Sequence, residues 1–273
     1  MTDGETRVLA TNIDDMLSAA TRAEDGWHYH IGSDWMQGRT AYGGISAALS
    51  LDAVTREFGG NHPAPLRSAQ IGFFGPVGGD VHVKPRLLRQ SKSSLFAASD
   101  LVSEAGYGTH ASFAFMSGRN SHIDHSHINA PDVPDAASLI SIPEHSARPA
   151  FARKFDMRPI RGPGFGHGLD EGDILTWVRW REPFSIDPHV ALLALADALP
   201  PAALPLFREF GPISSSTWIQ HFLTDEPDSK DGWWLLHSHT DHAARGFSAQ
   251  EMRIWNSDRQ LVSVGGQGVA IYV

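Results

Sequence analysis

Residues 187–202 read DPHVALLALADALPPA, and the rest of the architecture follows from them. Asp187 is suited to cap a helix N-terminus, and Pro188 to fill the first helical position. The turns that follow are almost wholly apolar, so we predict a helix over 187–199 that must be covered on all sides. Pro200 marks its end.

The same order of elements occurs twice along the chain. In each half a helical pattern precedes about four strand-like runs separated by turn residues, which favours antiparallel sheets. The first half has a predicted helix over 38–60 and strands over 66–77, 80–90, 94–104 and 107–118; the second has the 187–199 helix, a short helix over 201–211, and strands centred on 215 and over 232–240, 246–256 and 260–273. Each sheet would wrap around its helix, and the two units could join edge to edge. Residues 120–169 between them are rich in Pro, His and Gly and are predicted to be a long linker.

Composition excludes several classes of protein. The 273 residues carry a net charge of −9, which argues against nucleic-acid binding and against a polybasic membrane patch. The chain contains no cysteine, so disulfides, thiolate metal sites and a cysteine nucleophile are excluded. There is no apolar run long enough for a membrane span and no signal-peptide pattern, and we therefore expect a cytoplasmic protein.

One motif points to a metal. HSHTDH at 237–242 matches the H-x-H-x-D-H pattern of dinuclear zinc hydrolases, in which alternating imidazoles converge on metal ions. Such sites need further ligands downstream, and no histidine follows His242. We keep a zinc hydrolase as an alternative but expect no metal.

Three unusual features lie in the second half. Asp197 is the one carboxylate in an apolar helix end, where burial and the macrodipole would both raise its pKa, unless it points to solvent. Gln267 sits among Gly265, Gly266 and Gly268 inside a strand, a pattern typical of a bulge or of a ligand close to the backbone. Three serines and a threonine at 214–217 open another strand, where such residues usually serve turn chemistry.

GRTAYGG (38–44), LADALPPA (195–202) and LVSVGGQG (261–268) together resemble the acyl-CoA thioesterase II (TesB-like) family. The resemblance covers nearly the whole chain apart from the linker. It implies an α+β fold of two fused hotdog domains, each an antiparallel sheet wrapped around a central helix. We place the N-terminal hotdog at 1–120, the linker at 121–165 and the C-terminal hotdog, which carries the catalytic residues, at 166–273.

The resemblance also implies a reaction: hydrolysis of an acyl-CoA thioester by activated water, without metal or cofactor. It assigns the general base to Asp197 and the water-positioning groups to Gln267 and Ser215, with Ser214, Ser216 and Thr217 as register alternatives. Backbone N–H groups near Gly43 and Gly44 would bind the substrate carbonyl oxygen. Ile45 replaces the Gln that many relatives have after the glycine pair. A homodimer is expected from the resemblance only.

Two further alternatives stay open at this point. A hotdog protein could bind acyl-CoA or another lipid without hydrolysing it. A hotdog dehydratase or isomerase would need a helix His–acid pair, but His189 and Asp197 are about 12 Å apart along their helix, which does not favour direct contact.

Overall fold

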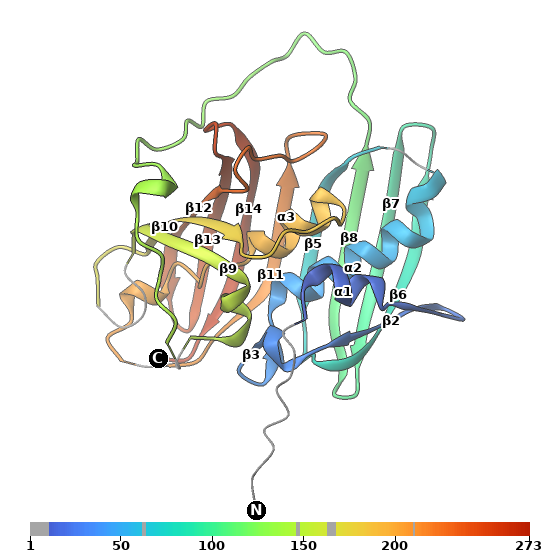
Figure 1. Cartoon of the computed structure of the whole chain (residues 1–273), viewed down its shortest axis with the longest axis horizontal. Coiled ribbons are helices and arrows are strands. Elements are labelled where there is room, and N and C mark those ends of the chain that lie inside the picture. Colours follow the sequence, from blue (N-terminus) through green and yellow to red (C-terminus); the bar gives the residue numbers. More distant parts are fainter. Residues whose placement is uncertain (1–10, 62–63, 146–147, 163–167, 210) are drawn as a thin grey trace, which may run out of the picture.

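The fold is described from a computed structural model, which describes residues 11–61, 64–145, 148–162, 168–209 and 211–273. Twelve antiparallel strands form a single sheet in the order β1-β2-β6-β7-β8-β5-β11-β14-β13-β12-β10-β9 (Figure 1). Their bounds are β1 Thr21–Ala23, β2 Gly26–Ile31, β5 Leu66–Phe73, β6 Gly79–Gln90, β7 Ser94–Ser103, β8 Gly106–Met116, β9 Phe155–Arg161, β10 Asp173–Trp180, β11 Ile213–Phe222, β12 Trp234–Ala244, β13 Phe247–Asn256 and β14 Leu261–Ile271.

The two halves of the sheet have the same internal order and meet where β5 pairs with β11. In each half a short edge strand and its neighbour, β1–β2 or β9–β10, precede the helix, and four longer strands follow it. This confirms the predicted α+β class and the duplicated helix-then-strands order. The strands β1, β2, β9 and β10 were not predicted, and β9 falls inside the range assigned to the linker. The division of the chain into 1–120, 121–165 and 166–273 stays a prediction.

Three α-helices lie on one face of the sheet (Figure 1). They are α1 Ile13–Ser18, α2 Gly43–Phe58 and α3 Pro188–Ala196, and α2 packs directly against α3. The Asp187 side chain accepts hydrogen bonds from the backbone N–H groups of the two residues after Pro188, which confirms the predicted N-cap. Every residue of α3 after Pro188 is buried, as its apolar sequence requires.

Two sequence predictions for helices need correction. The helix predicted over 38–60 is α2 and starts only at Gly43, because the residues before it form the two-stranded pair β3 Met36–Gln37 and β4 Thr40–Ala41. The helix predicted over 201–211 is wrong: in the described residues of this range, 201–209 and 211, the one helical element is the 3-10 turn η5 Leu204–Leu206. The prolines in PAALP lack an amide hydrogen, so a regular helix would lose hydrogen bonds. The other 3-10 turns are η1 Ser33–Trp35, η2 Gly59–Asn61, η3 Ala136–Ser138 and η4 Ala150–Lys154.

The segment after β8 crosses one end of the sheet to reach the second half (Figure 1). Part of it then covers the outer sheet face, where Ile128, Val133 and Ala136 pack on a second hydrophobic cluster. This cluster consists mainly of large side chains from β10, β12 and their neighbours: Leu175, Trp177, Trp233, Leu235 and Trp255. The outer face of β10, β12 and β13 is therefore covered as well, whereas α2 and α3 pack on the inner face of the sheet.

Within the described ranges, the chain has no helix whose length and apolar character would let it span a bilayer.

Candidate active site

Asp197 is the residue immediately after α3 and lies where the end of α3 meets the start of α2. Its carboxyl group accepts hydrogen bonds from the Gln267 side chain, with Nε2 to Oδ1 at 2.6 Å, and from the backbone N–H of Gly44. Three segments that are far apart in sequence thus meet at one carboxyl group.

Burial raises the pKa of Asp197 to about 7, and the hydrogen bonds from Gln267 and Gly44 oppose this shift. The sequence left open whether this carboxylate points to solvent, and the structure places it inward. Desolvation favours the neutral acid because a buried carboxylate loses its hydration. A carboxyl group with a pKa near 7 can both accept and release a proton near neutral pH.

Gln267 lies on β14 with its side chain almost fully buried. Close packing explains the glycines around it: a β-carbon on Gly265 would lie 2.2 Å from the Ile219 carbonyl oxygen, and one on Gly268 would lie 2.9 Å from Thr217 Oγ1. The neighbouring strand β11 therefore approaches β14 too closely for side chains at these two positions.

Ser215 Oγ donates to Gln267 Oε1 at 3.4 Å, which brings the third predicted residue to the same group. A β-bulge makes this contact. Ser215 pairs with Val269 and Thr217 with Gly268, so Ser216 is the extra residue in β11. Without the bulge, Ser215 would share a sheet face with Thr217, which is exposed on the outer face.

The other hydroxyl residues of this segment lie elsewhere. Ser214 and Thr217 are exposed, and Ser216 Oγ donates to the Gly268 carbonyl oxygen at 2.9 Å. Among the four register alternatives, Ser215 is therefore the one whose hydroxyl contacts Gln267.

Gly43 and Gly44 lie against the carboxyl group at the start of α2. A β-carbon on Gly43 would lie 2.7 Å from Asp197 Oδ2, and one on Gly44 would lie 2.4 Å from the Ala194 carbonyl oxygen. Tyr42, the N-cap residue of α2, donates its hydroxyl to the same Ala194 oxygen at 2.6 Å. The two helices can approach this closely only because both positions lack a side chain.

Gln250 on β13 belongs to the same network and was missed by the sequence reading. Its Nε2 donates to Gln267 Oε1 at 3.1 Å, and its Oε1 accepts from the Ala202 backbone N–H at 2.7 Å. This fixes the amide orientation of Gln267, whose oxygen faces two donors and whose nitrogen therefore faces Asp197. A signal was present in the sequence, because Gln250 alternates with Ser248 and Met252, all buried, along the strand.

The HSHTDH segment lies on β12, away from this network. His237 Nε2 lies 2.9 Å from Asp173 Oδ2, and His239 Nδ1 lies 3.6 Å from the same oxygen. His242 is exposed beyond a register shift in β12. In the described part of the chain, no three His, Cys, Asp or Glu side chains are grouped so that they could hold a metal ion.

A hollow of about 450 Å³ lies at the seam between the two halves, lined in part by Gln70, Gly72, His110, Ser112 and Thr217. These residues alternate with core residues along their strands, so the hollow opens on the outer sheet face. It contains none of the three predicted catalytic residues, and we assign it no part in the chemistry.

Solved structures with the same fold cover nearly the whole chain. A conserved hotdog-fold protein of unknown function from Alicyclobacillus acidocaldarius matches with a TM-score of 0.83 at 22% identity, over 96% of this chain and 99% of its own. A putative thioesterase II from Thermobifida fusca matches with a TM-score of 0.80 at 16% identity, over 96% and 98%. The acyl-CoA thioesterase II TesB2 of Mycobacterium marinum matches with a TM-score of 0.73 at 17% identity, over 95% and 98%. The fold is therefore two fused hotdog domains.

Family models match both halves of the sequence. The acyl-CoA thioesterase N-terminal domain matches residues 31–116, and the acyl-CoA thioesterase C-terminal domain matches residues 129–271. The chain belongs to the acyl-CoA thioesterase family, as its TesB-like motifs indicated. No curated protein sequence matches the chain.

Proposed function

We propose that this protein hydrolyses an acyl-CoA thioester to the free acid and CoA, with Asp197 as general base. Family membership supports the substrate class. The observation that carries the proposal is the hydrogen bond from Gln267 to Asp197, a half-buried carboxyl group whose pKa is raised by desolvation to about 7.

The chemistry needs only water and one base, because a thioester is already activated. Asp197 takes a proton from a water molecule as the water oxygen attacks the carbonyl carbon. The tetrahedral intermediate then breaks its carbon–sulfur bond, and the proton on Asp197 passes to the departing sulfur. The carboxylate is thereby restored, and the products are an acid and a thiol.

The neighbouring groups take supporting roles in this proposal. Gln267 and Ser215 help to position the attacking water. The Gly44 N–H donates to Asp197. We therefore assign the stabilisation of the negative charge that develops on the carbonyl oxygen to the Gly43 N–H, at the N-terminus of α2. Acyl-CoA is the proposed small-molecule partner. A homodimer and a cytoplasmic location remain predictions.

The test compares native protein with Asp197→Asn on acyl-CoAs of short, medium, long and aromatic acyl groups, with a thiol reagent as the readout. We expect native turnover and a loss of about 10²–10⁴-fold in kcat for the variant, the usual contribution of a general base. Circular dichroism checks that the variant is folded. Turnover of a folded Asp197→Asn protein at the native rate would show that the base is wrongly assigned.

The same assay decides between the enzyme and a protein that only binds acyl-CoA. Such a protein would show saturable binding in calorimetry but no thiol release with any acyl group. The raised pKa of Asp197 favours the enzyme, because a purely structural site gains nothing from a buried carboxyl group without a cationic partner.

A further inference from the structure

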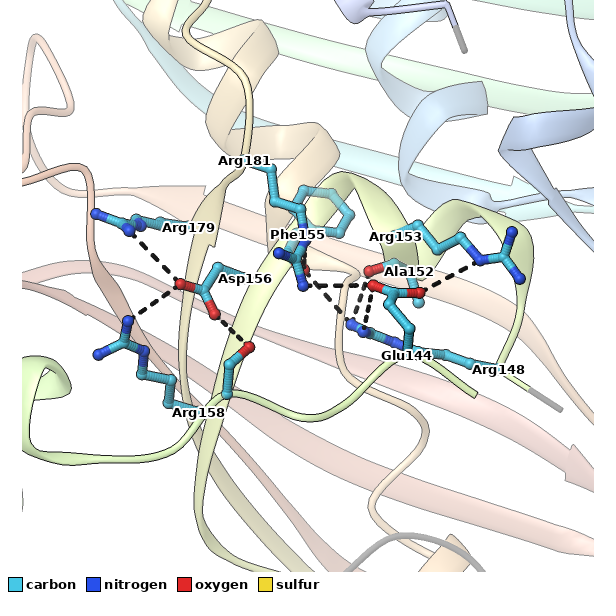
Figure 2. Close-up of polar contacts among 10 residues, drawn as sticks. Glu144, Arg148, Ala152, Arg153, Phe155, Asp156, Arg158, Arg179 and Arg181 are labelled. Carbon is cyan, nitrogen blue, oxygen red and sulfur yellow. Dashed lines mark hydrogen bonds and ion pairs between the residues drawn. The ribbon is translucent and has the colours of Figure 1, made fainter. Parts of the chain in front are cut away.

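A cluster of five arginines lies in the segment before β9, on β9, on β10 and immediately after β10. Figure 2 shows Arg148, Arg153 and Arg181 around Glu144, and Arg158 and Arg179 around Asp156. We call these seven side chains the arginine cluster. Its formal charge is three units positive, on a chain whose net charge is −9.

This excess of positive over negative side chains is specific to the arginine cluster. Among the ion pairs of the described residues, Glu144 and Asp156 are the only carboxylates that face more than one Lys or Arg side chain. Each of the others has at most one such partner. An excess of guanidinium groups held close together is a typical binding site for phosphate groups.

The buried member of the cluster is under-compensated. The Arg148 side chain is only 8% exposed, and its Nη1 has no hydrogen-bond partner, although Glu144 Oε1 lies 3.5 Å away. Burial lowers the pKa of Arg148, and the charges of Arg181 and Arg153 lower it further against the pull of Glu144. An added anion would relieve this repulsion.

Three of the remaining four arginines are accessible to a ligand. Arg153, Arg179 and Arg181 are 56%, 40% and 38% exposed. Arg179 also stacks over the Trp233 ring at 4.5 Å from its centroid, which limits the freedom of its side chain. A ligand would therefore meet guanidinium groups that are partly ordered in advance.

The part of the cluster around Glu144 is connected to the candidate active site through one short segment. The Phe155 carbonyl oxygen accepts from Arg181 Nε at 3.2 Å, and the Phe155 ring packs edge-on against Tyr42. The Phe151 ring also stacks on the Tyr42 ring, with 4.0 Å between the two centroids. Tyr42 immediately precedes Gly43, which lies against Asp197.

We propose that the arginine cluster binds the phosphate groups of the CoA moiety, with Arg153, Arg179 and Arg181 in direct contact. This deepens the proposed function and rests on it. CoA carries a diphosphate and a 3′-phosphate at the far end of a long pantetheine arm, so its phosphates must bind near the reacting carbonyl but not at it. The basic residues Arg86, Arg89 and Lys92 on and after β6 are assigned no role.

The experiment uses two thioesters of the same acid: acyl-CoA, and acyl-N-acetylcysteamine, which has no phosphate. Arg153→Ala, Arg179→Ala and Arg181→Ala are each expected to raise KM for acyl-CoA about tenfold, as for the loss of one charge-assisted hydrogen bond. The kinetics with acyl-N-acetylcysteamine should not change. Glu144→Gln should have the opposite effect and lower KM for acyl-CoA, because it removes a competing carboxylate.

Arg89→Ala is the matched control, since it removes the same charge from an exposed position on β6. It should leave both KM values unchanged. Equal effects of the arginine variants on both thioesters, no effect on either, or an Arg89→Ala effect as large as that of Arg181→Ala would each overturn the proposal. Acyl-dephospho-CoA, which lacks the 3′-phosphate, shows which phosphate each arginine binds.

Failure of the proposed function is distinguishable from failure of this assignment. If native protein hydrolyses neither thioester, the proposed function is wrong, and calorimetric titration with CoA itself decides the assignment. Affinity about tenfold weaker in Arg181→Ala than in native protein and Arg89→Ala supports it. Equal affinities contradict it.

Discussion

The two halves of the molecule place a carboxylate at the same distance in sequence from the start of their helices, with different surroundings. Asp52 lies nine positions after Gly43, the first residue of α2, and Asp197 lies nine positions after Pro188, the first residue of α3. Asp52 Oδ2 accepts from Arg56 Nε at 2.6 Å and from the Tyr29 hydroxyl at 2.7 Å. Asp197 receives an amide and a backbone N–H instead of a cation.

In the proposed mechanism, this difference separates a structural carboxylate, Asp52, from the general base, Asp197. A cationic partner compensates the negative charge and keeps a carboxylate ionised, whereas burial with only neutral donors moves its pKa toward neutral pH. In the proposed mechanism, the two halves of the duplicated fold therefore contribute different groups to the site. The first half contributes backbone groups at the start of α2, and the second half contributes the side chains.

The largest effect after loss of the base itself is expected for Gln267→Met. The variant removes the donor to Asp197 and the acceptor for Ser215, and kcat for acyl-CoA should fall about hundredfold, as when one preorganised donor is lost. Gln220→Met is the control, because Gln220 is also a buried amide on this sheet but bonds to Ser263. A similar loss of kcat in both variants would point to general destabilisation.

A smaller effect is expected for Gln250→Met, which tests a positioning role. Without the Gln250 donor, the Gln267 amide can turn its oxygen toward Asp197, which disfavours the carboxylate. We expect kcat to fall about tenfold, KM to stay constant, and the acid limb of the pH–rate profile to move to higher pH. A lower kcat with an unchanged limb would mean that Gln250 does not act through Asp197.

A weaker effect still is expected for Ser215→Ala. Its hydrogen bond to Gln267 is long, so kcat should fall about fivefold, corresponding to about 1 kcal/mol. Ser216→Ala should leave kcat unchanged, because Ser216 bonds to the Gly268 carbonyl. Steady-state kinetics of the two variants side by side tests the bulge-dependent register, and a larger loss in Ser216→Ala would reverse the assignment.

No effect on kcat is expected for Asp52→Asn, the counterpart of the base in the first half. The variant weakens the pairing with Arg56 and Tyr29, so the free energy of unfolding should fall by about 1 kcal/mol. Denaturant unfolding measures the stability, and the thioesterase assay measures kcat. A loss of kcat comparable to that of Asp197→Asn would remove the distinction between the two carboxylates.

Much of this arrangement was accessible from sequence, because its signals are local. The cap at Asp187, the carboxylate in an apolar helix end and the glycines around Gln267 are readable along the chain. The resemblance to the TesB-like family then indicated that Asp197 and Gln267 belong to one site. The Ser215 register was not readable, since the bulge depends on how β11 pairs with β14.

Other features could not be read because they form only in the folded chain. The apolar run of β10 lacks strand alternation, since residues 128–139 cover its outer face. The arginine cluster collects side chains spread from Arg148 to Arg181, so no local run of basic residues marks it. Gln250 was missed although the alternation of its strand marks it as inward-facing, because nothing in the local sequence shows which group a buried amide will contact.

The pH dependence of kcat/KM for acyl-CoA tests the central claim most directly, because it reports the base in the free enzyme. With a pKa raised to about 7, Asp197 is protonated and inactive as a base at lower pH, so the rate should rise with pH and level off above about pH 7. An acid limb centred near pH 7 is the predicted result. A profile that is flat from pH 5 to pH 8, as an ordinary exposed carboxylate would give, would contradict the account.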